Sequence, residues 1–533
     1  MISKKLLALA IGGALLTACG SDDGNPNQNY TGELQQIGRY SSGLFDAGGA
    51  EITAFCASSN KLFVVNSGAA SIDVLDLSDP LNPQKLTTLD VRQTQVNGFA
   101  AGGANSVAVH NGKLAVAVEN DNKQAKGQVY FYHTDTLAFA GAAAVGALPD
   151  MVTFTPNGDY VLSANEGEPN DAYDNDPEGS VSIIKVSDMS VRTAGFSEFN
   201  QDKQNLIEKG VRIGGPAGTS VAQDLEPEYI TISRDNNTAY VALQENNALA
   251  VIDIQRAEVQ TILPLGYKDH SQPGNGLDAN KNDKTAAIEL LPVYGMYQPD
   301  AIASYMAADG NTYIVSANEG DGRDYDGYSD EIKLQDLPLD EASFSSSQIE
   351  RLTDADGLGD LAVTNTMGDT DNDGKFEQIY AYGGRSFSIW DSHGQLVFDS
   401  GDQFEQHLKQ VAGQYFNVSN DNNKIDNRSD NKGPEPEGVT LAKFGNQVFA
   451  YIGLERQGGI MVYNISNPRL PQFVQYLNNR DFSISADENN PAAAGDLAPE
   501  GLLVISASDS PNGEPLLVVG NEVSGTTTIY QIR

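Results

Sequence analysis

A two-part pattern repeats along almost the whole 533-residue chain and limits the folds that the chain can adopt. Each unit opens with a proline and an acid ahead of a short apolar run, as in Pro149 with Asp150 and Pro227 with Glu228. A second apolar run then ends in a glutamate, and most units add a third run rich in β-branched residues, such as 181–184. Eight candidate units begin near residues 51, 104, 148, 226, 298, 360, 435 and 498, of which the unit near 360 is degenerate.

Short strands that are separated by turn residues and repeated in this way are typical of a β-propeller. We therefore predict an all-β fold, a β-propeller of seven or eight four-stranded blades that forms one domain over residues 33–533. The last unit offers three strands, and the segment 34–40 is expected to supply the fourth, which would close the ring and remove exposed sheet edges. Tandem β-sandwiches and an open solenoid are the alternatives, and residues 405–411 are the best candidate for a short helix.

The recurring acids are expected to gather on one face. In an antiparallel sheet the first strand begins at the end where the second strand finishes, so the two acids of each unit should lie together around a central channel. Like charges this close raise one another's pKa, and Ca²⁺, which binds six to eight oxygens, relieves the repulsion. We therefore predict an acidic, calcium-binding mouth, whereas the alternative is that each acid only caps a corner of its own blade. The predicted metal ligands are Glu166, Glu228, Asp300, Glu319, Asp321, Glu437, Glu455, Glu500 and Glu522, on a rim that also includes Glu119, Asp150 and Glu245.

A separate acidic loop offers a second metal site. Asp369, Asp371 and Asp373 occupy alternate positions ahead of a glycine, and Glu377 follows. Carboxylates in this spacing are typical of a calcium loop. Because Tyr380 stands at position twelve, where an EF-hand has a glutamate, we predict a compact calcium loop of another kind; a solvated turn is the alternative.

Three arginines stand close to these acids in the sequence, namely Arg323, Arg385 and Arg456. A guanidinium group binds phosphate or sulfate through paired, charge-assisted hydrogen bonds. We predict that these arginines contact an anionic substrate, with a purely structural role in ion pairs as the alternative.

The charge balance excludes one class of partner. The chain has 33 Lys and Arg against 72 Asp and Glu, a formal net charge of −39, whereas nucleic acids are bound through clustered cations. Nucleic acid is therefore not an expected partner, and we expect a monomer. The sequence lacks H-E-x-x-H and G-x-S-x-G motifs, and no G-x-G-x-x-G opens a helix after a strand, so no catalytic residue is predicted.

The N-terminus has the features of a targeting segment. An apolar run over 6–16 is too short to span a bilayer but suits a signal peptide, and it leads into a Leu-Thr-Ala-Cys-Gly motif that resembles a bacterial lipobox. We predict a lipoprotein signal peptide over 1–18, and a lipidated Cys19 with a flexible tether over 19–32, so that the lipid bilayer is a partner. Gly20 stands where an aspartate would signal inner-membrane retention, which favours the outer membrane of a Gram-negative cell. An ordinary secretory signal with a chance cysteine is the alternative.

Four stretches of sequence resemble one protein family. They are QPDAIASY (298–305), ANEGDGRDYDGYSDEIKL (317–334), GDTDNDGKFEQIYAYGGRSFSIWD (368–391) and RSDNKGPEPEGVTL (428–441). Together they resemble the choice-of-anchor I family, which is related to mesenchyme-specific cell-surface glycoproteins of biomineralising animals. The resemblance implies an extracytoplasmic, propeller-like domain attached to the envelope. Members are often labelled alkaline-phosphatase-like or phytase-like, yet the family implies no settled catalytic residues.

Two functions are compatible with these observations. The first is a non-catalytic surface module for binding or adhesion, whose calcium-loaded mouth contacts a mineral surface, a polysaccharide or a protein. The second is a calcium-dependent phosphohydrolase, in which a metal-activated water attacks a phosphate ester held by the three arginines. The surplus of carboxylates without a recognisable nucleophile favours the first.

Overall fold

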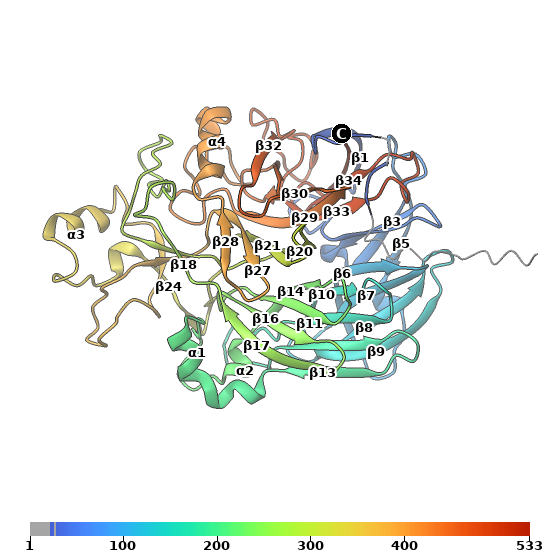
Figure 1. Cartoon of the computed structure of the whole chain (residues 1–533), viewed down its shortest axis with the longest axis horizontal. Helices are drawn as coiled ribbons and strands as arrows, with labels where there is room; N and C mark the ends of the chain where they lie inside the picture. Colours follow the sequence, from blue (N-terminus) through green and yellow to red (C-terminus); the bar gives the residue numbers. More distant parts are fainter. Residues whose placement is uncertain (1–21, 26–27) are drawn as a thin grey trace, which may run out of the picture.

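Strands dominate the computed structural model, which describes residues 22–25 and 28–533. The described residues form seven four-stranded antiparallel sheets, together with one sheet of five strands and one of two (Figure 1). The prediction of an all-β fold is confirmed. The predicted signal peptide over 1–18 and the predicted lipidation at Cys19 lie outside the described residues.

The first four sheets are each built from strands that follow one another in the sequence. The first contains β2 (Thr53–Cys56), β3 (Lys61–Asn66), β4 (Ser71–Asp76) and β5 (Gln84–Asp90). The second contains β6 (Ala101–His110), β7 (Lys113–Asn120), β8 (Lys126–His133) and β9 (Phe139–Ala147). The third contains β10 (Pro149–Phe154), β11 (Tyr160–Asn165), β12 (Ser180–Lys185) and β13 (Val191–Gly195). The fourth contains β14 (Pro227–Ile232), β15 (Thr238–Leu243), β16 (Ala248–Asp253) and β17 (Glu258–Pro264).

The other three four-stranded sheets include two departures from simple sequence order. One sheet combines β20 (Ile302–Met306) and β21 (Thr312–Asn318) with the later strands β27 (Ser386–Asp391) and β28 (Leu396–Asp399). The next contains β29 (Pro436–Phe444), β30 (Gln447–Leu454), β31 (Ile460–Asn464) and β32 (Gln472–Leu477). The last combines β33 (Pro499–Ile505), β34 (Leu516–Asn521) and β35 (Thr526–Ile532) with the N-terminal strand β1 (Leu34–Ser41).

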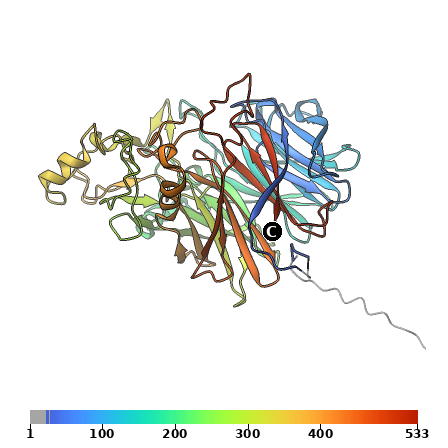
Figure 2. The same cartoon turned by 90° about the horizontal axis from the view of Figure 1, so that it is seen from above.

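Strand β1 completes the last sheet, as predicted. It runs antiparallel to β35, and Leu34 pairs with Ile532 while Ser41 pairs with Thr526. Figure 2 shows β1 in blue beside the red C-terminal strands. The two ends of the chain are thus joined by a ladder of backbone hydrogen bonds, which covers the edge that β35 would otherwise expose.

The first strands of the seven sheets lie side by side in a fixed order. Contacts run from β2 to β6, β10, β14, β20, β29 and β33, and β33 in turn contacts β2. Because neighbouring sheets pack against both faces, the middle strands are almost entirely buried: β34 is buried over its whole length, and β3 and β11 are buried after their first residue. The fourth strands face solvent, and β5 is exposed over most of its length.

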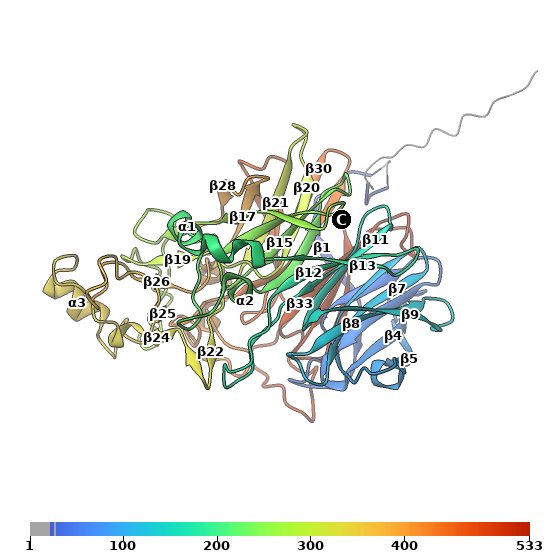
Figure 3. The same ribbon diagram turned by 90° about the horizontal axis from the view of Figure 1, so that it is seen from below.

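The region between β21 and β27 does not form the eighth unit that the sequence pattern near residue 360 predicted. Its short strands β24 (Glu331–Lys333), β25 (Ala362–Thr364) and β26 (Tyr380–Ala381) join β18 (Tyr267–Asp269) and β19 (Tyr294–Met296) in the five-stranded sheet. The prediction failed because β27, the strand that follows this region, pairs with β21 instead. The region also holds β22 (Asp324–Tyr325), β23 (Tyr328–Ser329) and α3 (Ser346–Leu352), and it projects from one side of the molecule (Figures 1 and 3).

The helices of the described residues are short and lie in the connections between strands. The longest is α4 (Gln403–Val411), which includes the predicted helix over 405–411. No helix in the described part of the chain has the length and apolar character needed to cross a bilayer. The remaining helical segments are α1 (Lys203–Lys209), α2 (Val221–Asp224) and the 3₁₀ turns Ser67–Ala69, Val91–Gln93, Ser197–Asp202, Leu334–Asp336 and Gly413–Tyr415.

The described part of the predicted tether contacts the sheets. Asp23 forms two hydrogen bonds with the backbone of Lys443. Asp23 N donates to Lys443 O at 2.8 Å, and Lys443 N donates to Asp23 Oδ2 at 2.7 Å. The ring of Tyr30 stacks on Phe444 at 4.2 Å between centroids. These contacts hold the described residues of 22–32 against the turn between β29 and β30, where a flexible tether was predicted.

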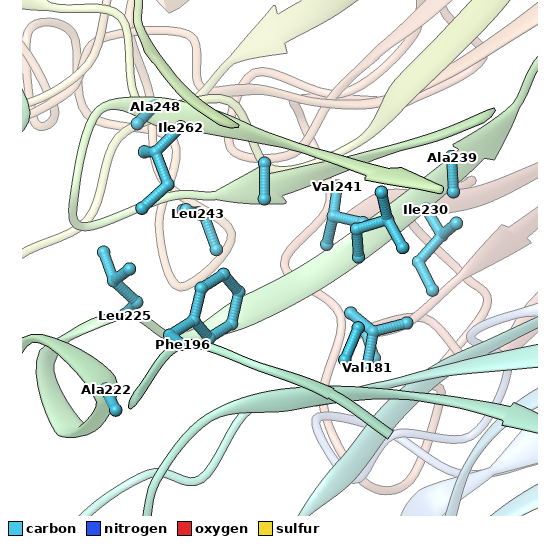
Figure 4. Close-up of a cluster of buried hydrophobic side chains, with 14 of the residues drawn as sticks. Val181, Phe196, Ala222, Leu225, Ile230, Ala239, Val241, Leu243, Ala248 and Ile262 are labelled. Carbon is cyan, nitrogen blue, oxygen red and sulfur yellow. The ribbon is translucent and has the colours of Figure 1, made fainter. Parts of the chain in front are cut away.

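The hydrophobic core is divided among the contacts between neighbouring sheets. Figure 4 shows the cluster between the β10–β13 and β14–β17 sheets, in which Val181, Val241 and Leu243 meet. Phe196 and Leu225, from the connection between these two sheets, cover one end of the cluster. The connection is therefore part of the core and not a free loop.

The first prediction concerns the strength of this packing. Leu243 is fully buried, so Leu243→Ala should lower the free energy of unfolding by about 2–5 kcal/mol. Leu86 is 52% exposed on β5, and Leu86→Ala should change it by no more than about 0.5 kcal/mol. Urea unfolding followed through the fluorescence of Trp390, the single tryptophan, measures both. Equal losses in the two variants would contradict the assignment of the core.

Candidate functional site

The proline-acid corner of four sheets contains a β-bulge. In β10, Pro149 pairs with Asn165 but Val152 pairs with Ser163, so the register shifts across Asp150. Proline fits the first position of the strand because it has no N–H to pair, and a bulge re-aims the residue beside it. The acid is thereby turned out of the hydrogen-bonded ladder. The same shift follows Pro227 in β14, Pro436 in β29 and Pro499 in β33.

The glutamate at the end of the second strand lies beside this corner. The N–H of Glu166 donates to Leu148 O at 2.9 Å, and the N–H of Glu522 donates to Ala498 O at 2.8 Å. Glu455 makes the same bond, at 2.8 Å, to Glu435 O. Each acceptor is the residue that precedes the proline. The two acids of each of these units therefore lie at the same end of their sheet, as the repeat pattern predicted.

The corner acids of different sheets meet at a small cavity of about 60 Å³. It is lined by Asp150, Asp300, Glu437 and Glu500. Asn105 of β6, a neutral residue at the corner position where these sheets have an acid, also lines it. Tyr229, Ile52, Ser106 and Met151 line this cavity and also a larger one of about 320 Å³, so the two cavities are neighbours. We use the name mouth for the corner acids and the terminal glutamates around this cavity.

Burial in the mouth raises the pKa of its carboxyl groups. Burial and the nearby Glu522 and Asp150 raise the pKa of Glu51 to about 8, and burial raises the pKa of Glu245 to about 7. Burial, with Glu168 and Glu119, raises the pKa of Asp150 to about 6. The pKa of each of the following is raised well above its ordinary value by burial and then by neighbouring carboxylates: Glu166, Glu228, Asp300, Glu437, Glu455 and Glu500.

Several mouth oxygens have no partner in the protein. One carboxylate oxygen, Oε2, of each of Glu228, Glu245, Glu437 and Glu500 is buried without a hydrogen bond. A buried polar atom without a partner costs free energy, and a buried charge costs more. Capping of their own blades does not account for these oxygens, because they accept no hydrogen bond there, and Glu437 and Glu500 line the shared cavity.

The protein's own cations reach one side of the mouth. Lys432 Nζ lies 2.7 Å from Glu319 and 3.5 Å from Glu435, and Arg456 Nη2 lies 3.1 Å from Glu455. On the other side, among the described residues, no lysine or arginine forms an ion pair with Asp150, Glu228 or Glu500. The cation found on that side is Lys123, whose Nζ lies 3.9 Å from Glu119, so charge compensation in the mouth is weaker there.

Two arginines predicted to contact a substrate are instead buried in structural ion pairs. Arg323 is 1% exposed and lies 3.1 Å from Glu226, while Arg385 Nη1 lies 2.8 Å from Glu405. Both guanidinium groups are engaged in ion pairs inside the protein. Their acidic partners are distant in sequence and are brought close by the connections between sheets. Arg456, with a side chain 31% exposed, is the predicted arginine that stays accessible at the mouth.

The predicted loop ligands come together away from the sheets. Asp369, Asp371, Asp373 and Glu377 each bring a carboxylate oxygen within 4.8 Å of the others. The loop is shaped by its own amides, since Gly374 N donates to Asp369 Oδ2 at 3.0 Å and Thr370 N donates to Glu377 Oε2 at 2.6 Å. Carboxylates held in this way leave lone pairs on the outer side for a cation.

The mouth brings most of the predicted ligands together and adds others. Asp300, Glu319 and Glu437 have oxygens within 4.8 Å of one another, and so do Glu319, Glu435 and Glu455. Asp321 lies at the edge, 54% exposed and 3.9 Å from Lys432. The predicted ligand set did not include Glu51, Glu226 or Glu435, and the predicted cations did not include Lys432, although Lys432 and Glu435 stand in the 428–441 stretch. Glu51 precedes the first strand of the first unit, where it lacks the usual proline, and Glu435 stands between two prolines. Their positions in the sequence could therefore have indicated both as corner acids.

Two curated proteins are similar to parts of this chain. Gigasin-3a of Magallana gigas is 29% identical over 185 residues, which are 33% of this chain and 65% of that protein. A mesenchyme-specific cell surface glycoprotein of Strongylocentrotus purpuratus is 25% identical over 316 residues, which are 52% of this chain and 40% of that protein. The matched part is less than two thirds of either relative.

Solved structures are similar at low identity. Kuenenia stuttgartiensis hydrazine synthase covers 91% of this chain and 96% of its own, with a TM-score of 0.46 and 12% identity. The β-propeller domain of Cps50 (Swd1) of Myceliophteria thermophila covers 94% and 100%, with a TM-score of 0.43 and 9% identity. The sequence model of the choice-of-anchor I domain matches residues 51–468, most of the chain, and this protein therefore belongs to the choice-of-anchor I family.

Proposed function

We propose that this protein is a cell-envelope β-propeller, anchored by lipid on Cys19, whose acidic mouth binds Ca²⁺ and through it an anionic or oxygen-rich partner. Membership of the choice-of-anchor I family supports a surface-associated module. The contacts that return from β33 to β2, and the pairing of β1 with β35, support a closed ring of seven blades. Closure of this kind would fix the corner acids at the distances that a shared cation needs.

The observation that carries the proposal is the set of buried carboxylate oxygens without partners. Glu228, Glu437 and Glu500 each present one such oxygen, and Asp300 lies with Glu437 within reach of one ion. A hard cation with oxygen ligands would satisfy these atoms and offset their mutual repulsion. Ca²⁺ suits the mouth better than Mg²⁺, because it tolerates irregular geometry and more ligands.

The partner follows from the chemistry of such an ion. Ca²⁺ held by carboxylates at the end of a channel keeps coordination positions for an outside ligand. Polysaccharide hydroxyl and carboxylate groups, a mineral surface and a phosphate ester all supply the oxygens required. The protein thus acts as a binding or adhesion module, with the metal as the shared contact.

A calcium-dependent phosphohydrolase remains the second candidate, supported by Arg456. Its guanidinium lies beside Glu455 and is partly exposed at the mouth, where it would contact a phosphate bound to the metal. The burial of Arg323 and Arg385 removes the other two groups of the expected anion clamp. We therefore place binding before catalysis.

The N-terminal contacts also orient the mouth relative to the anchor. β33 starts at the mouth, β35 runs in the same direction, and β1 runs back, so Leu34 lies at the far end of its sheet. Asp22 and Asp23 bind the β29–β30 turn at that same far end. Three peptide units separate Cys19 from Asp22, a reach of about 11 Å. A lipid on Cys19 would therefore hold the far face against the bilayer and leave the mouth facing outward.

The second prediction concerns pH and calcium. The mouth carboxyls bind protons more tightly in the folded state, so the metal-free protein should lose stability as pH rises from about 4.5 to 8. Calcium at about a hundred times its dissociation constant should restore about 2.7 kcal/mol at pH 8. Thermal melts across pH, with and without calcium, measure both effects.

The matched variants for this experiment are Glu437→Gln and Glu341→Gln. Glu437→Gln should stabilise the metal-free protein at pH 8 and weaken calcium binding, because it removes one buried charge from the mouth. Glu341 is exposed and far from the repeat pattern, so Glu341→Gln should behave as wild type. Stability that rises with pH in the absence of metal would count against a mouth of protonated, ion-binding carboxyls.

The third prediction separates binding from catalysis. With p-nitrophenyl phosphate or phytate as substrate, we expect no calcium-dependent turnover above the uncatalysed rate. Turnover that appears with calcium and is lost in both Glu319→Gln and Arg456→Ala, with their melting transitions intact, would instead assign the protein as a phosphohydrolase.

The fourth prediction concerns orientation. A fluorophore on Asn446→Cys, in the β29–β30 turn, should be quenched strongly by a headgroup quencher in vesicles that carry the lipidated protein. The same fluorophore on Asn122→Cys, between β7 and β8 at the mouth end, should be quenched weakly. Incorporation of labelled fatty acid tests the lipid itself: a protein that takes up the label but shows the reverse pattern would refute the orientation alone.

A further inference from the structure

A second group of buried oxygen atoms lies where two connecting segments meet beside α4, outside the mouth and the 369–377 loop. Asp278 belongs to the segment before β19, and Asn417 and Asp426 belong to the segment before β29; all three are fully buried. Glu405 of α4 joins the two segments, because its Oε2 accepts the Asp278 N–H at 3.0 Å and its Oε1 accepts Asn417 Nδ2 at 2.9 Å.

Asp426 and Asn417 are side by side and lack partners for their oxygens. Asp426 N donates to Phe416 O and Arg428 N donates to Asn417 O, each at 2.9 Å. These bonds place Asp426 and Asn417 on the two facing sides of one narrow loop. Both carboxylate oxygens of Asp426 and the amide oxygen of Asn417 are buried without a hydrogen bond. The Thr285 N–H lies close enough to Asp426 to lower the pKa of that carboxyl, and it donates to Asp283 Oδ1 at 2.8 Å.

The charges around Asp426 are not balanced by the protein. Arg385 is matched by Glu405, at 2.8 Å, and Lys281 is held by Asp430 at 2.7 Å and Asp360 at 3.0 Å. Burial and the nearby Asp278, Asp283 and Glu405 raise the pKa of Asp426 to about 8. A single proton on Asp426 would neutralise one carboxylate oxygen and leave the other without a partner, whereas a bound cation would coordinate both.

We propose that a Ca²⁺-type cation binds between these two segments, with Asp426 as its central ligand and with oxygens of Asn417, Asp278 and Asp283 around it. The set contains carboxylate and amide oxygens only, which selects hard divalent cations over zinc or copper. The ion fixes the segment that continues to Lys432 and Glu435, and so it holds the cationic side of the mouth in place.

The test counts ions on the full-length mature protein after chelation. Calcium titration by calorimetry, with terbium luminescence as a second readout, gives the number bound to wild type, Asp426→Asn and Asp421→Asn. Asp426→Asn should bind one ion fewer and show a smaller rise in Tm with calcium. Asp421 is exposed on the same segment, and Asp421→Asn should match wild type.

Two further measurements keep a folding defect apart from a lost ligand. Without calcium, and at a pH above about 8 where Asp426 is ionised, Asp426→Asn should melt above wild type, because it removes an uncompensated buried charge. Asp283→Asn, at an exposed ligand, should fold normally and bind this ion about tenfold more weakly. The proposal is overturned if Asp426→Asn binds as many ions as wild type, or if it melts lower than wild type in the absence of metal at that pH.

Discussion

Carboxylates buried opposite one another at the ends of stacked sheets are the constraint on which the rest of this structure depends. In four sheets the proline-acid corner adds a bulge that turns one carboxylate out of its ladder. In three units the terminal glutamate is joined to the same corner by a backbone hydrogen bond. The arrangement is costly, since burial and like charges both oppose ionisation. The repulsion and the cost of burying these charges must therefore be offset by a bound proton, a cationic side chain or a bound metal.

The regular strands supply the acids, and the long connections supply most of the compensating cations. Lys432 comes from the segment between β28 and β29, and Arg323 comes from the region between β21 and β27. The sheets without such connections keep their acids uncompensated, as at Asp150 and Glu500. The long connections therefore determine which part of the mouth keeps carboxylates without a nearby cation.

The repeat pattern was enough to predict the strands and the end of the sheets at which the acids lie. Pro149 with Asp150, and Glu166 after the next strand, recur in a spacing that antiparallel pairing converts directly into proximity. The region before β27 was not predictable in the same way. Its strands are two or three residues long, and β19 pairs in parallel with β26 across a wide separation in sequence, so no local periodicity marks them. The eighth unit near 360 was wrong for this reason.

The arginines and the buried loop oxygens show where sequence patterns stop being informative. Arg323 stands next to Asp324 in the sequence, yet its partner Glu226 comes from another connection. The partner of Arg385 is Glu405 of α4, and only the folded chain places these two residues together. Asn417 and Asp426 match no metal motif, because their spacing follows a narrow loop and the other ligands that we propose come from residues 278–283. Irregular segments that bury charge thus have to be judged by their unpartnered atoms. By that criterion the mouth and the two segments beside α4 are alike, because both contain buried oxygens without partners. In the mouth these oxygens arise from a repeat, whereas beside α4 they arise from a single loop.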